Sequence, residues 1–198
     1  MRYSTPGAAP AFAQGFTLVE LLVSMAIIAV ISTMMVVNFR AGKQRDELQA
    51  GAREVAFLIE QARTYALAGK TVKLGGTMRV PPGGWGVSLF PQNDSSAFFA
   101  DEGSHVYEKG SEPYEEEHPL ADWNLVLDDC VDYGSGCLNE SQLDTIFSAP
   151  LGTRFIQAGT ANTGSATFTL RHSANPAGPG VAITMNAVSG QVSLRDVP

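Results

Sequence analysis

Gly15-Phe16-Thr17-Leu18-Val19-Glu20-Leu21-Leu22 opens the stretch of sequence that decides the fold. The chain from Phe16 to Val37 is apolar, and its polar residues are Thr17, Glu20, Ser24, Ser32 and Thr33. As a helix, this stretch would span about 33 Å at ~1.5 Å per residue, enough to cross a hydrocarbon core of about 30 Å. The sequence therefore predicts a transmembrane helix over residues 16–37.

The order of signals argues against an ordinary secretory signal peptide. Such a peptide has a shorter apolar region, and a cleavage site of small residues follows it. The A-x-A-like triplet in this part of the chain, Ala11-Phe12-Ala13, instead precedes the apolar run. The apolar segment is therefore expected to remain in the mature protein.

Glu20 is an acid inside a spanning segment, where a charge costs on the order of 2.5–3.5 kcal/mol at the helix centre. The run from Gly15 to Leu22 closely resembles the processing motif of type IV pilins and type II secretion pseudopilins. Glycine, aromatic residue, threonine, acid and apolar helix follow in the family's order. The resemblance implies a leader peptide over residues 1–15, which prepilin peptidase removes by cutting after Gly15. It also implies N-methylation of Phe16, a role for Glu20 in assembly, and other pilin or pseudopilin subunits as partners.

The flanking charges give little help with the orientation in the membrane. Ala13-Gln14 stands where relatives often have basic residues, and Arg2 is the only charged side chain of the leader. Arg40, Lys43 and Arg45 flank the far end, where the positive-inside rule favours fewer cations. The predicted topology therefore rests on the motif: a single-pass protein of the cytoplasmic (inner) membrane with a periplasmic or otherwise extracytoplasmic head, located in a filament after assembly.

Beyond the membrane segment, the apolar pattern predicts that the helix continues over residues 38–69 and stops at Gly69. One stripe of an amphipathic helix recurs at spacings of three and four residues: Leu48, Ala52, Val55, Ile59, Ala62 and Ala66. A coiled-coil dimer is the alternative, but the stripe lasts only about three heptads. We expect the stripe to pack on the head instead.

Residues 70–198 are rich in Gly and Pro and contain short β-type runs, so we expect a β-rich head and an α+β fold, with the long helix packed on an antiparallel sheet. Residues 92–122 are polar and acidic and are expected to be an irregular insertion. The expected strands are Thr71–Leu74, Gly84–Phe90, Asn124–Asp128, Thr145–Ser148, Arg154–Ala158, Ala166–Arg171, Val181–Ala187 and Gln191–Arg195, the last two forming a hairpin.

Within the family, the head resembles the H-type minor pseudopilins and related minor pilins. The resembling runs are Gly84-Trp85-Gly86-Val87, Phe147-Ser148-Ala149-Pro150-Leu151-Gly152 and Ser189-Gly190-Gln191-Val192. The resemblance implies a structural minor subunit whose helix packs on two small antiparallel sheets. The major pseudopilin is the main alternative, but its C-terminal calcium loop has no counterpart in this sequence.

Charge and motifs narrow the function further. Residues 46–198 hold 9 basic and 19 acidic side chains. This balance disfavours nucleic-acid binding, because affinity for phosphates comes mostly from Lys and Arg. A minor type IV pilin for DNA uptake or adhesion is nevertheless the alternative function. No catalytic motif is found, so we expect no enzymatic activity, and an anchored periplasmic enzyme is the third option.

Two further features carry site predictions. Cys130 and Cys137 are expected to form a disulfide if the head is extracytoplasmic, with two free thiols as the alternative. Asp128, Asp129 and Asp132 could give three of the six to eight oxygens that calcium needs, but their spacing does not fit an EF-hand. We therefore expect a solvated acidic loop without a cofactor, and calcium binding is the alternative.

Overall fold

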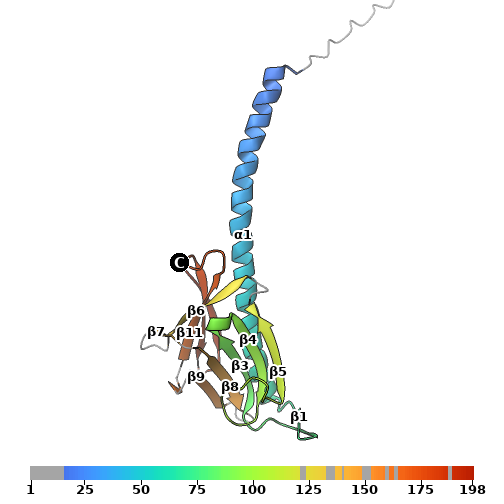
Figure 1. Cartoon of the computed structure of the whole chain (residues 1–198), viewed down its shortest axis with the longest axis vertical. Coiled ribbons are helices and arrows are strands. Elements are labelled where there is room, and N and C mark those ends of the chain that lie inside the picture. The colour runs from blue at the N-terminus through green and yellow to red at the C-terminus, as the bar shows by residue number, and fades with distance from the viewer. Residues whose placement is uncertain are drawn as a thin grey trace, which may run out of the picture. The chain divides into compact units, whose positions relative to one another are not determined.

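Helix α1 runs from Leu18 to Leu67 in a computed structural model of the chain (Figure 1). The structure describes residues 16–120, 124–132, 137–139, 141–148, 153–158, 161–162, 165–186 and 189–198. The chain divides into two units, the first ending at Gly42 and the second running from Lys43 to Pro198. Antiparallel sheets follow the helix, so the predicted α+β fold is confirmed.

The C-terminal end of α1 has a clear local cause. Gly69 has a φ of 61°, the left-handed conformation that glycine adopts without steric cost. The amide of Gly69 donates to the carbonyl of Ala66, and the amide of Lys70 donates to that of Tyr65. These two bonds form a Schellman motif, which satisfies carbonyls that the helix end would otherwise leave unpaired. Gly69 is therefore the helix stop that the sequence predicted.

The described strands of the second unit form three antiparallel sheets. The smallest is a hairpin of β1 (Val72–Leu74) and β2 (Thr77–Arg79). The six-stranded sheet has the order β10 (Ala161–Asn162), β9 (Thr153–Ala158), β8 (Leu143–Ser148), β3 (Gly84–Phe90), β4 (Ser95–Asp101) and β5 (Tyr114–Pro119). The five-stranded sheet has the order β13 (Val192–Val197), β12 (Gly180–Asn186), β11 (Ser165–His172), β6 (Leu125–Asp132) and β7 (Cys137–Asn139).

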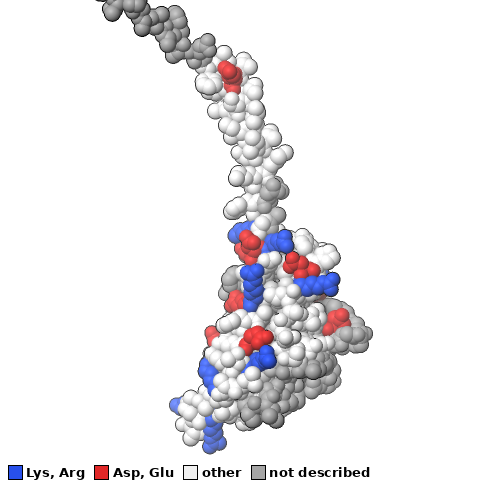
Figure 2. Space-filling model, turned by 180° about the vertical axis from the view of Figure 1, so that it is seen from behind, with Lys and Arg blue, Asp and Glu red and all other residues white. Residues whose placement is uncertain are grey.

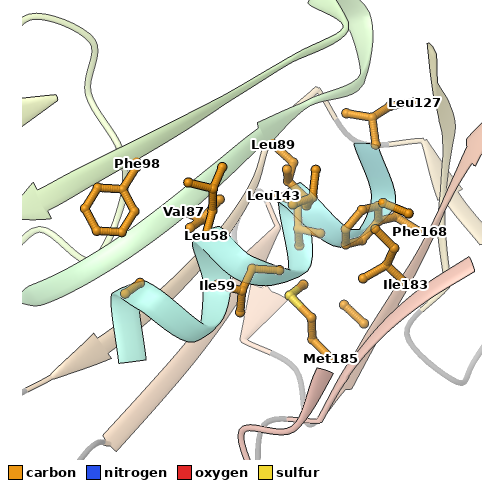
Figure 3. Packing of buried hydrophobic residues seen from close by; sticks show 14 of the residues in the cluster. Leu58, Ile59, Val87, Leu89, Phe98, Leu127, Leu143, Phe168, Ile183 and Met185 are labelled. Carbon is orange, nitrogen blue, oxygen red and sulfur yellow. The ribbon is translucent and has the colours of Figure 1, made fainter. Parts of the chain in front are cut away.

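One hydrophobic core joins the helix to both large sheets. All six residues of the predicted apolar stripe on α1 are buried in it. The six-stranded sheet contributes Val87, Phe98 and Leu143, among others, and the five-stranded sheet contributes Phe168 and Ile183. Figure 3 shows these side chains meeting beside the helix. The stripe is thus the surface on which the two sheets are brought together.

The prediction of an irregular insertion over residues 92–122 is wrong. A short 3-10 helix (Pro91–Asn93) leads into β4, and β5 follows after a connecting segment. Strand β4 lacks the apolar–polar alternation of a half-buried strand because both of its faces are covered. Phe98 lies in the main core, whereas its neighbour Phe99 packs with Tyr107 and Ile146 in a second cluster on the other face of the sheet.

Other strand predictions hold with shifted ends. Strand β3 has the predicted bounds, and β12 and β13 form the predicted hairpin, with the amide of Gly190 donating to the carbonyl of Asn186. Besides β4, the sequence missed β2, β5, β7 and β10, all of which are short or lie at a sheet edge. Such strands carry few apolar residues, so they form by pairing with a neighbour and leave a weak pattern in the sequence.

A pair of helix substitutions tests the core. Ile59 is 1% exposed, so Ile59→Ala should lower the free energy of unfolding by about 2–5 kcal/mol, through lost burial and the cavity left behind. Phe57, two residues away, is 64% exposed, and Phe57→Ala should change it by less than about 0.5 kcal/mol. The measurement is chemical denaturation of the full chain in detergent, followed by tryptophan fluorescence. Equal effects of the two substitutions would contradict the packing of this helix face.

Candidate functional site

The candidate site is the apolar first part of α1, which carries the predicted processing and assembly residues. Leu18–Val36 is long and apolar enough to cross a membrane, with a mean hydropathy of 2.3 and no part buried inside the protein. Its 19 residues span about 28 Å as a helix. Phe16, just before it, is 85% exposed. Gly15 lies outside the described residues, so the structure gives no geometry for the predicted cleavage bond.

Thr17 and Glu20 cap the beginning of α1. The Glu20 amide donates to Thr17 Oγ1 over 3.2 Å, and the Thr17 amide donates to Glu20 Oε2 over 3.3 Å. The Thr17 hydroxyl also donates to the same carboxylate oxygen, at 3.2 Å. This reciprocal arrangement is a capping box, in which two amides that lack intrahelical partners are satisfied by side chains.

The capping box gives Glu20 a local role that the sequence interpretation missed. The signal was present in the sequence, because Thr17-Leu18-Val19-Glu20 fits the S/T-x-x-E pattern directly before an apolar run. A carboxylate in the first turn also interacts favourably with the positive end of the helix dipole. The capping bonds use Oε2, and among the described residues no hydrogen bond is made to Oε1.

Two hydroxyl groups within the apolar segment, those of Ser24 and Thr33, are satisfied by the helix itself. Ser24 Oγ donates to the carbonyl of Glu20 at 2.7 Å, and Thr33 Oγ1 donates to the carbonyls of Ala29 and Val30. In hydrocarbon, where water is absent, such internal bonds remove the cost of an unpaired hydroxyl. These two side chains therefore do not interfere with placement of the segment in a membrane.

The predicted head sites lie partly outside the described residues. Strand pairing places Cys137 opposite Asp132 and Cys130 opposite Asn139, but the side chains of both cysteines are outside the described part of the chain. The disulfide therefore stays a prediction. The side chain of Asp129 is also outside it, and Asp128 lies 3.5 Å from Arg171. Among the described residues, no group of three His, Cys, Asp or Glu could hold a metal ion.

The segment between β4 and β5 is held to the sheet by carboxylates. Asp101, fully buried, accepts hydrogen bonds from the amides of Gly103, Ser104 and His105. Burial and, to a lesser extent, the nearby Asp101 carboxylate together raise the pKa of Glu112 to about 7. Acids that bind backbone amides explain part of the acidic composition of the head as structural.

The capping box can be tested apart from any assembly. Thr17→Val removes the hydroxyl and should destabilise the first turn by about 1 kcal/mol, whereas Thr17→Ser keeps the cap. The amide of Glu20 should then exchange its hydrogen about fivefold faster in the valine variant than in the serine variant. Hydrogen exchange measured by NMR on the full chain in micelles is the test. Equal exchange in both variants would show that the hydroxyl does not cap the helix.

Comparison with known proteins agrees with this reading of the N-terminal segment. Residues 12–36 match the family model described as the prokaryotic N-terminal methylation motif. No curated protein and no solved structure gave a significant match to the chain. The matched range includes Thr17, Glu20 and the apolar helix, and it supports membrane anchoring. Residues 12–36 of the chain thus carry the N-terminal methylation motif that is characteristic of type IV pilins and pseudopilins.

Proposed function

We propose that the chain is a structural, non-enzymatic subunit of a filament: a minor pseudopilin of a type II secretion pseudopilus, or a minor subunit of a related type IV filament. The main support for this proposal is that the residues matching the methylation motif also form an exposed apolar helix with a capped N-terminus. A helix of this kind must be covered by lipid or by other helices. A bundle of such helices, each carrying its own head, is a filament.

In this proposal the chain is first a membrane-bound precursor and then, after processing, a filament subunit. The precursor waits in the inner membrane with residues 16–37 as its spanning helix, residues 38–69 as the amphipathic continuation and residues 70–198 as the extracytoplasmic head. Prepilin peptidase removes residues 1–15 and methylates Phe16. The mature helix then leaves the lipid and packs among the helices of neighbouring subunits.

In this packing, Glu20 sets the axial register between the helices of neighbouring subunits. After cleavage, the new ammonium of Phe16 lies four residues, or about 6 Å along the helix, from Glu20. The capping box occupies Oε2, which leaves Oε1 for a further partner. A carboxylate in hydrocarbon is tolerated when it is paired, so we propose the Phe16 ammonium of the neighbouring subunit as that partner. A pair within one helix is the competing arrangement.

The proposed processing after Gly15 can be tested on the mature N-terminus. Mass spectrometry of the protein from native membranes should find a chain that begins at Phe16 with a methylated amine. Gly15→Val should block this processing because a side chain would obstruct the peptidase, whereas Ala13→Val, two residues away, should leave it intact. A native chain that begins at Met1, or that is cut after Ala13, would contradict the proposed processing.

Two substitutions of Glu20 separate the effect of its charge from its capping role. Glu20→Leu and Glu20→Gln should both be cut after Gly15 and remain in the membrane. Losing one member of a buried ion pair costs on the order of 3–5 kcal/mol. The amount of partner subunit that co-purifies with either variant should therefore be at least tenfold lower than with the parent chain. The glutamine variant keeps an oxygen for the capping box but lacks the charge.

Thr17→Val is the matched control, because it weakens the cap and keeps the carboxylate; it should assemble like the parent chain. If Glu20→Gln assembles normally and Glu20→Leu fails, then Glu20 serves assembly through its cap and the register proposal is wrong. Quantitative mass spectrometry of subunits cross-linked in cells distinguishes these cases.

A further inference from the structure

Two oppositely charged surfaces lie on the second unit. The acidic one comprises the connecting segment after β4 together with β5: residues 101–117 contain seven acids, and Lys109 is their only Lys or Arg. Within β5, Glu116 and Glu117 are exposed, and Tyr114 is 40% exposed. Strand β5 is an edge strand of the six-stranded sheet, so its outer backbone groups have no strand partner among the described residues.

The basic surface is the β1–β2 hairpin. From Gln61 to Asn93 the chain has no acid and four basic residues, of which Lys73 and Arg79 lie on the hairpin strands. In Figure 2, blue side chains without red ones mark the end of the head where Figure 1 labels β1. Among the described residues, neither Lys73 nor Arg79 forms an ion pair.

The hairpin is built to project from the head. Gly75 and Gly76 have φ values of 53° and 89°, the positive values that a two-residue type I′ turn requires. Among the strands that the structure describes, the hairpin pairs with neither large sheet, and every residue of β2 is exposed. Met78, which pairs with Lys73 across the hairpin and directly precedes Arg79, is 64% exposed. Met and Arg, which Met78 and Arg79 provide here, are enriched in protein-contact surfaces.

We propose that the β1–β2 hairpin of one copy docks on edge strand β5 of a second copy of this chain. Lys73 and Arg79 would face Glu116 and Glu117 of the neighbour, and Met78 would pack near its exposed Tyr114. The inference rests on the proposed filament role and adds that two copies of this minor subunit can occupy adjacent positions of the filament.

Charge complementarity identifies the occupant. Two β5 edges would repel each other through their glutamates, and two hairpins would repel each other through their cations. The contact between a hairpin and a β5 edge is therefore favoured over contacts between identical surfaces. A contact between two different surfaces of the same chain is heterologous, and repeating it gives a ring if the rotation closes and an open helical assembly if it does not. The free edge of β5 can also accept the backbone of a strand such as β2.

The test uses the full chain in native membranes, with a photo-reactive amino acid in place of Met78 and two differently tagged copies expressed together. Cross-linked dimers should contain both tags, and peptide mapping should join position 78 of one copy to residues 114–119 of the other. Lys73→Glu combined with Arg79→Glu should reduce the cross-linked dimer at least fivefold. Glu116→Lys combined with Glu117→Lys should do the same, and all four changes together should restore it.

Arg53→Glu, which reverses an exposed cation on α1, is the control and should leave the cross-link unchanged. A cross-link from position 78 to nucleic acid or to a different protein, or a dimer that ignores the charge reversals, would overturn the inference. So would the absence of a dimer. Two further measurements on the same sample test the proposed filament role separately from the docking contact. They are the mass of the N-terminal peptide and the co-purification of other filament subunits.

Discussion

The head depends on the close approach of two β-sheets to one helix face. Three of the six residues in the buried stripe of α1 are alanines, Ala52, Ala62 and Ala66, and none of them has exposed surface. Small side chains at these positions let the strands come near the helix backbone, while Leu48, Val55 and Ile59 fill the remaining space. A larger residue at an alanine position would push a sheet away and open both halves of the core, since overpacked cores are also destabilised.

The same helix meets a different constraint in its first part. Over Leu18–Val36 no side chain is buried in the protein, so every apolar group there needs lipid or a neighbouring helix. The Thr17–Glu20 box closes the helix start without help from the head. Glu20 therefore combines two tasks: it caps its own helix through one oxygen, and its charge demands a partner once the segment is surrounded by apolar groups.

The sequence predicted those parts of the molecule in which large apolar residues recur at a regular spacing. The helix stripe and strand β3 follow from spacing alone, and the stop at Gly69 follows from the conformation that only glycine adopts easily. Strands β4 and β5 could not be predicted in this way. The first is covered on both faces and shows no alternation, and the second carries three consecutive glutamates and is a strand because it pairs with β4. The contact between the helix and both sheets is long-range in sequence and leaves no local signal. At the site, the motif located Glu20, but its capping role needed the geometry of Thr17.

The central claim, that the Glu20 carboxylate pairs with the Phe16 ammonium of a neighbouring subunit, can be measured directly by solid-state NMR of assembled filaments. One population of the chain is labelled with ¹⁵N at Phe16 and a second with ¹³C at the Glu20 carboxylate, and the two are mixed before assembly. We expect a ¹⁵N–¹³C correlation in the mixed sample, corresponding to an ion pair with nitrogen and oxygen within about 4 Å. A correlation that appears only when both labels are on the same chain would contradict the account.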